Sequence, residues 1–186
     1  VPELDGPEAE IQGPRRRAGM SELGVVDQAA VAVFQGRILG TGPQVELIQA
    51  LYGRDGQPDD VEVIDARGSA VIPGFVDPHT HTVFGKTRQD EYERRIKGET
   101  YLEIAAAGGG IHSSVEDLRG RSEDDLVELA VPRLVEMLVH GTTTVEIKSG
   151  YGLSLEDELK MLRAARRAAD LAGIRSVRTC LAAHEM

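Results

Sequence analysis

Between residue 71 and the last residue, strand patterns alternate with capped helix patterns, and no other feature of the sequence restricts the fold as strongly. Strands are predicted ahead of Asp77, over residues 142–147 and over residues 175–181. The segments between them contain helix-capping residues followed by apolar residues at helical spacing. Successive strand–helix units pair their strands in parallel through right-handed crossovers. The alternation therefore predicts an α/β fold.

Two helices between these strands can be predicted in most detail. The first is capped by Ser122, contains Pro132, which is expected to kink or split it, and ends at Gly141. The second begins at Ser154 and ends at Gly173. The predicted apolar faces are Leu126, Leu129, Ala130, Leu134, Met137 and Leu138 in the first helix and Leu155, Leu159, Leu162, Ala165 and Ala169 in the second.

The segment 71–84, VIPGFVDPHTHTVF, places two histidines at the end of the first predicted strand. Successive strand residues point to opposite faces, so His79 and His81 project to the same side, about 6.6 Å apart along the backbone. Two such imidazoles can bind one metal ion at about 2.0–2.1 Å each. Pro78 has no N–H for a ladder, so regular pairing is expected to end near Asp77, with the histidines just beyond it. The alternative for a bare His-x-His is a pair of half-exposed loop histidines.

The second predicted strand has two unlike faces. Val145 and Ile147 point one way, and Thr144, Glu146 and Lys148 point the other way. In a closed barrel the apolar pair would contact the helices, and the two charged residues would lie in the inner top layer. Buried charges need partners, so an ion pair between Glu146 and Lys148 is expected.

Arg88 follows the histidine pair on the loop 85–88, which would lie at the mouth of a metal site built on those histidines. Its planar guanidinium suits a carboxylate better than a lysine would, and the alternative is one surface charge among many. Tyr101 begins a short helix that starts with the capping box 100–103 and ends at the glycines 108–110. Tyr101 lies beside the site only if the loop folds back, and packing is the alternative.

Tyr151 and His184 follow the second and third predicted strands. Tyr151 lies in the loop 149–152, whose two glycines let the backbone turn and approach a ligand closely. His184 lies just past the third strand, as the histidine pair follows the first. His112 and His140 follow no strand and are interpreted as surface or packing residues.

Composition excludes several classes of protein. The 21 Lys and Arg stand against 31 Asp and Glu, for a net charge of −10, and no basic stripe is interleaved with aromatic residues, so nucleic-acid binding is not expected. An acidic protein that binds an anionic substrate must carry positive charge locally. The single cysteine, Cys180, excludes an internal disulfide and fits a reducing compartment. Neither an 18-residue apolar run nor a signal peptide is visible, so we expect a cytoplasmic protein without membrane contact.

The sequence before residue 73 predicts a small β-rich domain over residues 25–72, preceded by a poorly ordered lead-in at 1–24. The predicted order is a hairpin over 25–40 turning at Gln35 and Gly36, a helix between Pro43 and Gly53, a polar loop at 55–60, and strands at 61–64 and 70–72 separated by a turn at 65–68. By pattern alone, this segment could equally be an independent half-sandwich.

Several motifs point to one superfamily. The pattern V-I-P-G-F-V-D-P-H-T-H resembles the first barrel strand of the metal-dependent amidohydrolases. The segments GGGI, TTTVEIKSGYG, DELKMLRAARR and AAHE follow in an order similar to that of one family within it, whose members open a lactam ring in histidine breakdown. The resemblance runs from about Gly13 to the last residue. Its most specific parts are DPHTHTVFGKTR and VEIKSGYGLSLEDELKMLR.

For the fold, the resemblance implies a (β/α)8 TIM-type barrel, with residues 73–186 forming about its first three β/α units. It also implies one metal ion, zinc or iron, held by His79 and His81. The family's other two ligands, a histidine after the fifth strand and an aspartate after the eighth, would lie beyond Met186. A closed barrel takes about 250 residues, so we expect a fragment that binds metal poorly and is inactive alone.

For the chemistry, the resemblance implies hydrolysis of the lactam C–N bond of 4-imidazolone-5-propanoate to N-formimidoyl-L-glutamate by a metal-activated water. His184 would hydrogen-bond the substrate carbonyl and stabilise the oxyanion. Arg88, Tyr101 and Tyr151 would hold the propionate and the ring of this small anionic substrate.

Other interpretations remain open. The same barrel could belong to a cyclic deaminase, to a non-catalytic relative without metal, or to a binding module. A carbamylated Lys148 that bridges two metal ions, as in some relatives, is an alternative to its ion pair. Assembly into a homodimer is left open as well.

Overall fold

The computed structural model describes residues 19, 21–53 and 61–184, which form two compact units divided between Ser69 and Ala70. The predicted lead-in lies almost entirely outside the described residues, and the predicted polar loop at 55–60 lies wholly outside them.

The first unit contains a two-stranded antiparallel sheet and one helix. Strands β1 (Ala29–Phe34) and β2 (Arg37–Pro43) form the predicted hairpin. Its two-residue turn has φ values of 48° at Gln35 and 74° at Gly36, the left-handed backbone that matches the twist of the flanking strands. Helix α1 (Gln44–Tyr52) follows directly, where the apolar spacing predicted it.

The strands predicted at 61–64 and 70–72 are absent, and that prediction was wrong. Ile64 is 84% exposed, because this segment has no partner strand: within the described residues β1 and β2 pair only with each other. The predicted turn between the two segments does form, since the Arg67 N–H donates to Asp65 Oδ1 at 3.0 Å. A pattern of apolar residues is therefore not sufficient for a strand without a neighbour to complete the ladder.

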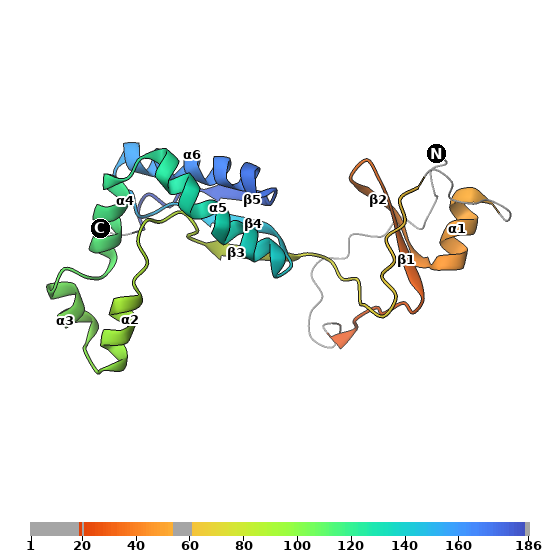
Figure 1. Cartoon of the computed structure of the whole chain (residues 1–186), viewed down its shortest axis with the longest axis horizontal. Coiled ribbons are helices and arrows are strands. Elements are labelled where there is room, and N and C mark those ends of the chain that lie inside the picture. Colours follow the sequence, from red (N-terminus) through yellow and green to blue (C-terminus); the bar gives the residue numbers. More distant parts are fainter. Residues whose placement is uncertain (1–18, 20, 54–60, 185–186) are drawn as a thin grey trace. The chain divides into compact units, whose positions relative to one another are not determined.

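The second unit is built on a parallel sheet with the order β3-β4-β5 (Figure 1). The strands are β3 (Phe75–Thr80), β4 (Thr142–Lys148) and β5 (Arg175–Thr179). All three were predicted, although β5 ends two residues earlier than expected. The parallel pairing confirms the predicted α/β class. The carboxyl ends of the three strands lie at one edge of the sheet.

Strand β3 continues past Pro78, contrary to the prediction that pairing ends near Asp77. Asp77 is in register with Val145 and Thr80 with Ile147, with an irregularity between them. Pro78 removes one N–H and so interrupts the ladder, but pairing resumes at Thr80. One predicted ligand therefore lies inside the strand and the other directly after it.

Helices α5 (Glu123–Val139) and α6 (Leu155–Ala172) lie side by side against the sheet (Figure 1). Both begin at predicted serine caps, Ser122 and Ser154. Pro132 lies inside α5 without splitting it. The core between the helices and the sheet contains Val83, Leu118, Leu126, Val127, Ala130, Leu134, Val145, Ile147, Met161, Ala164, Ala165, Ala168, Ala169 and Ile174.

The predicted apolar face of α6 was correct for Ala165 and Ala169, which are buried, but wrong for the leucines at the start of the helix. Leu155 is 79% exposed, whereas Met161 is 1% exposed. The buried face consists of Glu158, Met161, Ala164, Ala165, Ala168 and Ala169. Small alanine side chains let α6 approach its neighbours closely.

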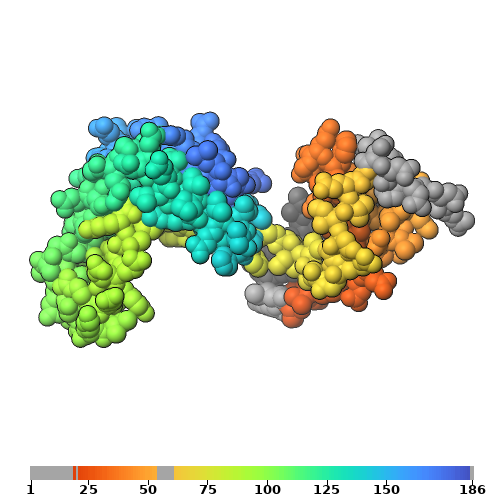
Figure 2. All heavy atoms as spheres, viewed as in Figure 1, coloured from red at the N-terminus to blue at the C-terminus, as the bar shows by residue number. Residues whose placement is uncertain are grey.

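Three shorter helices connect β3 to α5: α2 (Gln89–Ile96), α3 (Tyr101–Ala106) and α4 (Ile111–Gly120). The capping box of α3 was predicted and is present, whereas α2 and α4 were not predicted. Helices α2 and α3 project from one end of this unit (Figures 1 and 2). Among the described residues, no helix combines the length and the apolar character needed to cross a membrane.

Candidate active site

Four aromatic side chains from the ends of all three parallel strands meet around His81. The ring centroid of His81 lies 5.6 Å from that of His79, 5.0 Å from Tyr151 and 4.9 Å from His184. The rings of Tyr151 and His184 are 5.8 Å apart. The structure thus brings together four of the side chains that the sequence singled out, at the edge where parallel α/β folds bind their ligands.

The histidine pair is held by polar contacts of β3. The backbone N–H of His79 donates to Asp77 Oδ1 at 3.2 Å. Thr80 lies between the two histidines and points to the other side, where its hydroxyl donates to the Glu146 carbonyl oxygen at 2.7 Å. This bond joins β3 to β4 at the point where Pro78 interrupts the regular ladder.

The loop after β4 carries Tyr151 and is tied to the end of β5. The Ser149 N–H donates to the Thr179 carbonyl oxygen at 3.0 Å, and the Leu181 N–H donates to Ser149 Oγ at 3.1 Å. Gly150 has a φ of 127°, and a Cβ placed on it would lie 2.8 Å from the Cβ of His184. A glycine is therefore required here so that the loop can lie against His184.

The environment of His81 favours a neutral imidazole. Burial, together with the nearby His184, His79 and Lys148, lowers the pKa of His81 below its usual value. Its Nδ1 atom is buried and has no hydrogen-bond partner among the described residues. A neutral imidazole with an unpartnered buried nitrogen is what a metal ligand requires. His79 and His81 thus fit as two donors, although the described residues contain no group of three or more metal-binding side chains.

The polar face of β4 forms the predicted ion pair. Lys148 Nζ donates to Glu146 Oε1 at 2.5 Å, and Thr179 Oγ1 donates to the same oxygen at 2.5 Å. Hydrogen bonds from Lys148 and Thr179 lower the pKa of Glu146. The opposite face carries the buried Val145 and Ile147, as predicted.

A cavity of about 260 Å³ adjoins this cluster. It is lined by His81, Phe84, Lys86, Thr87, Arg88, Ser114 and Tyr151, of which two are cationic and none is acidic. A hollow of about 400 Å³ shares His81 but is lined mainly by β3, the residues after it and α5, and it contains neither Arg88 nor Tyr151. The smaller cavity is therefore the candidate substrate site.

Arg88 lines this cavity, and its side chain lies 3.8 Å from Glu91. Tyr101 does not line it: this side chain is 56% exposed on α3, and its hydroxyl lies near Gly110. The predicted set of substrate-contacting residues is thus brought together except for Tyr101. Whether these residues contact substrate stays a prediction.

Four lining residues were missed by sequence reasoning: Phe84, Lys86, Thr87 and Ser114. Ser114 belongs to α4, whose buried Val115 and Leu118 follow Ile111 at helical spacing and could have indicated the helix. Lys86 and Thr87 directly precede Arg88 in the sequence, but the sequence did not indicate that their side chains also line the cavity.

The comparisons with known proteins agree with this arrangement. A sequence model described as the amidohydrolase family matches residues 62–111. Over this segment, which contains the histidine pair and Arg88, the chain is similar to amidohydrolases.

Over nearly its whole length the chain is similar to imidazolonepropionases. It is 49% identical to the imidazolonepropionase of Symbiobacterium thermophilum and 48% identical to that of Myxococcus xanthus, in each case over 94% of the chain. It is 44% identical to that of Geobacillus kaustophilus over 92% of the chain. The chain spans about 40% of the length of each of these relatives.

Proposed function

We propose that the protein containing this chain hydrolyses the lactam C–N bond of 4-imidazolone-5-propanoate and forms N-formimidoyl-L-glutamate. The observation that carries the proposal is the convergence of His79, Tyr151 and His184 on His81. The adjoining cavity has two cationic lining residues and no acidic one, which suits an anionic substrate. The similarity to imidazolonepropionases supports the substrate.

In this proposal the three parallel strands are the beginning of a (β/α)8 barrel, and residues 25–72 are a separate small domain. The consecutive strand order and the position of the site at the carboxyl edge support the barrel. Among the described residues, β3 and β5 each have only β4 as a neighbour, so both could pair with further strands. A cytoplasmic location and a homodimer stay predictions from the sequence.

His79 and His81 would hold the metal ion, zinc or iron, because imidazole nitrogen suits both metals. When bound, such an ion polarises a carbonyl group and lowers the pKa of water toward neutrality. The lowered pKa of His81 keeps its nitrogen free of a competing proton.

The remaining side chains would bind and orient the substrate. Arg88 and Lys86 supply the positive charge that an anionic propionate needs in a chain of net charge −10. Tyr151 would lie against the imidazolone ring. His184 would donate a hydrogen bond to the lactam carbonyl oxygen and stabilise the negative charge that develops there.

A chimaera tests the proposal. The 174 aligned residues of the Symbiobacterium thermophilum imidazolonepropionase are replaced by those of this chain, and the product is assayed against 4-imidazolone-5-propanoate, other cyclic amides and cyclic amidines that deaminases use. We expect the imidazolone to have the highest kcat/KM of the panel. A folded, metal-containing chimaera that prefers another substrate, or hydrolyses none, contradicts the proposal.

A further inference from the structure

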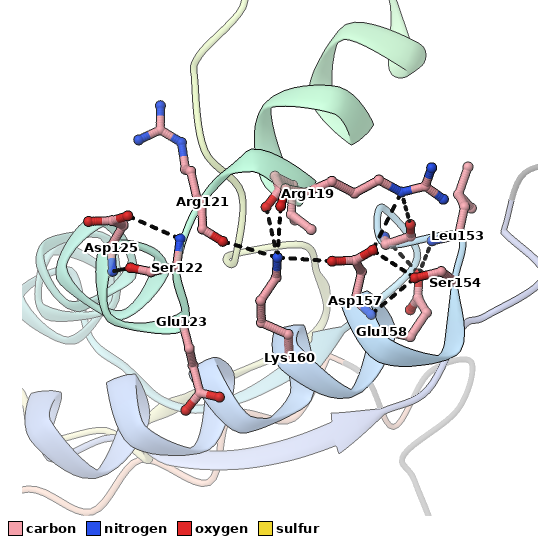
Figure 3. Close-up of polar contacts among 12 residues, drawn as sticks. Arg119, Arg121, Ser122, Glu123, Asp125, Leu153, Ser154, Asp157, Glu158 and Lys160 are labelled. Atoms are coloured by element: carbon pink, nitrogen blue, oxygen red, sulfur yellow. Dashed lines mark hydrogen bonds and ion pairs between the residues drawn. The ribbon is translucent and has the colours of Figure 1, made fainter.

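A buried carboxyl group holds the loop that carries Tyr151. Glu158, in the first turns of α6, is 2% exposed. Its Oε1 atom accepts two hydrogen bonds, from the Gly152 N–H at 2.7 Å and the Leu153 N–H at 2.8 Å (Figure 3). Its Oε2 atom is buried without a hydrogen-bond partner among the described residues. An apolar side chain at this position would avoid the desolvation cost of that oxygen but would leave the two backbone N–H groups without an acceptor, so this glutamate is tied to the loop 149–152.

Arg119 binds the carbonyl group of the same residue, Gly152. Its Nε atom donates to the Gly152 carbonyl oxygen at 2.7 Å and lies 3.6 Å from Asp157 Oδ2. Both backbone polar groups of Gly152 are therefore bound by side chains, one from α4 and one from α6. Figure 3 shows these contacts converging on the loop from the two helices.

Lys160 fixes the end of α4, which carries Arg119, to α6. Its Nζ atom donates to the carbonyl oxygens of Leu118, Arg119 and Arg121 at 3.0–3.2 Å and pairs with Asp157 Oδ1 at 2.9 Å (Figure 3). The Leu118 carbonyl oxygen also accepts the Arg121 N–H at 3.2 Å, and a cation stabilises the carbonyl end of a helix. Lys160 therefore holds in place the helix end from which Arg119 donates to Gly152.

The loop itself has a backbone that needs such support. Leu153 has a φ of 52°, a left-handed conformation that non-glycine residues avoid. A Cβ on Gly152 would lie 2.5 Å from the Glu158 backbone nitrogen, so the loop runs directly against the first turn of α6. Strained conformations persist where surrounding contacts determine them, and they are frequent at functional sites.

We propose that Glu158 is a positioning residue that, with Arg119, holds the Gly152 peptide so that Tyr151 lies against His81 and His184. The peptide it binds is the one directly after Tyr151, whose ring is 5.0 Å from that of His81. The proposal rests on the proposed function only for the role of Tyr151 in binding substrate. Its structural part can be tested separately.

The structural part is tested by amide hydrogen exchange and ring contacts in NMR spectra of the whole 186-residue chain. Glu158→Leu removes the acceptor, so the Gly152 and Leu153 amides should lose their protection and the Tyr151–His81 contact should weaken. Glu158→Gln keeps one accepting oxygen and should retain most of the protection. Arg119→Ala, at a half-exposed site that does not endanger folding, should weaken the Tyr151–His81 contact as well. The exposed Glu156→Gln, in the same turn of α6, is the control and should change neither quantity.

The functional part is tested in the chimaera. Glu158→Leu should raise KM for the imidazolone roughly tenfold, because a misplaced contact weakens binding, and should add little to the effect of Tyr151→Ala in the double variant. Unchanged exchange at Gly152 and Leu153 in Glu158→Leu overturns the proposal, as does full additivity with Tyr151→Ala. If the unsubstituted chimaera does not open the lactam, the proposed function fails, and the exchange data alone decide whether Glu158 positions the loop.

Discussion

At the scale of single residues, the candidate site depends on how His81 is surrounded. Its pKa is lowered mainly by burial, its Nδ1 has no hydrogen-bond partner among the described residues, and its ring lies among the rings of three other predicted site residues. The positive charge near it comes from the loop after β3, in which Arg88 and Lys86 line the cavity. Substitutions of individual residues test these two features separately.

Arg88→Ala in the chimaera should raise KM for 4-imidazolone-5-propanoate by roughly 10- to 100-fold with little change in kcat. A hydrogen bond to a charged group contributes about 1.5–3 kcal/mol, and a carboxylate remote from the reacting bond is bound equally in the ground and transition states. Steady-state kinetics measure both constants. The control is Arg95→Ala, an exposed arginine of α2. An unchanged KM would remove Arg88 from the site.

Asp117 provides a test in which pH changes stability. It accepts hydrogen bonds from Arg121 Nε and from the Lys86 N–H, both at 2.8 Å, and these bonds lower its pKa. A lowered pKa in the folded state means that the contribution is present above the unfolded value of about 3.9 and is lost as pH falls through the folded value. Asp117→Asn should therefore reduce the free energy of unfolding by about 1–2 kcal/mol at pH 7 and by progressively less below about pH 4.

Urea unfolding of this variant at pH 7, 5 and 3 measures the effect. Asp170→Asn is the control, because Asp170 and its i−4 partner Arg166 are both exposed and such pairs contribute little. A loss that is the same at pH 3 as at pH 7 would show that the charge of Asp117 is not what stabilises the cavity loop.

The sequence predicted the histidine pair, Tyr151 and His184 because each follows a strand of a repeating β/α pattern, and the carboxyl ends of parallel strands meet. It did not predict the contributions of Ser114 and Glu158. Ser114 reaches the cavity only because of the way in which α4 packs beside it. Glu158 is an acidic residue in a helix, and such residues are usually exposed. Both depend on tertiary packing that has no local signal.

At the scale of elements, capping residues predicted the starts of α3, α5 and α6 well, since a cap is a local interaction between a side chain and nearby N–H groups. Faces and strand ends were less predictable. The leucines of α6 suggested one face, but the alanines form the buried one. Likewise β3 continues beyond Pro78 because β4 supplies a partner, whereas residues 61–64 have none.

The register of α6 can be tested by stability measurements on the chain. Met161→Ala should lower the free energy of unfolding by about 2–5 kcal/mol, because it leaves a cavity in the core between the helices and the sheet. Leu155→Ala, which removes an apolar side chain of similar size from an exposed position, should change it by less than about 0.5 kcal/mol. Chemical denaturation followed by circular dichroism gives both values. If Leu155→Ala lowered the free energy of unfolding more than Met161→Ala, the face predicted from the leucines would be the buried one.

At the scale of the whole molecule, the chain contains the proposed metal-binding pair and the loops proposed to contact substrate, but it spans only about 40% of the length of the relatives it matches. Two imidazoles do not complete a metal site, and the three-stranded sheet has two outer strands without further partners among the described residues. The barrel and the reaction are therefore properties that we propose for the protein containing this chain. In that proposal, residues of this chain bind and orient the substrate, and a complete metal site requires further ligands.

The metal content of the purified chimaera tests the central idea that His79 and His81 share one metal ion. Elemental analysis should find about one zinc or iron ion per polypeptide, and the His79→Ala/His81→Ala variant should lose nearly all of it. The matched variant His112→Ala/His140→Ala, which removes two exposed histidines, should keep the metal. Retention of the metal after loss of His79 and His81 in a folded protein would contradict the account.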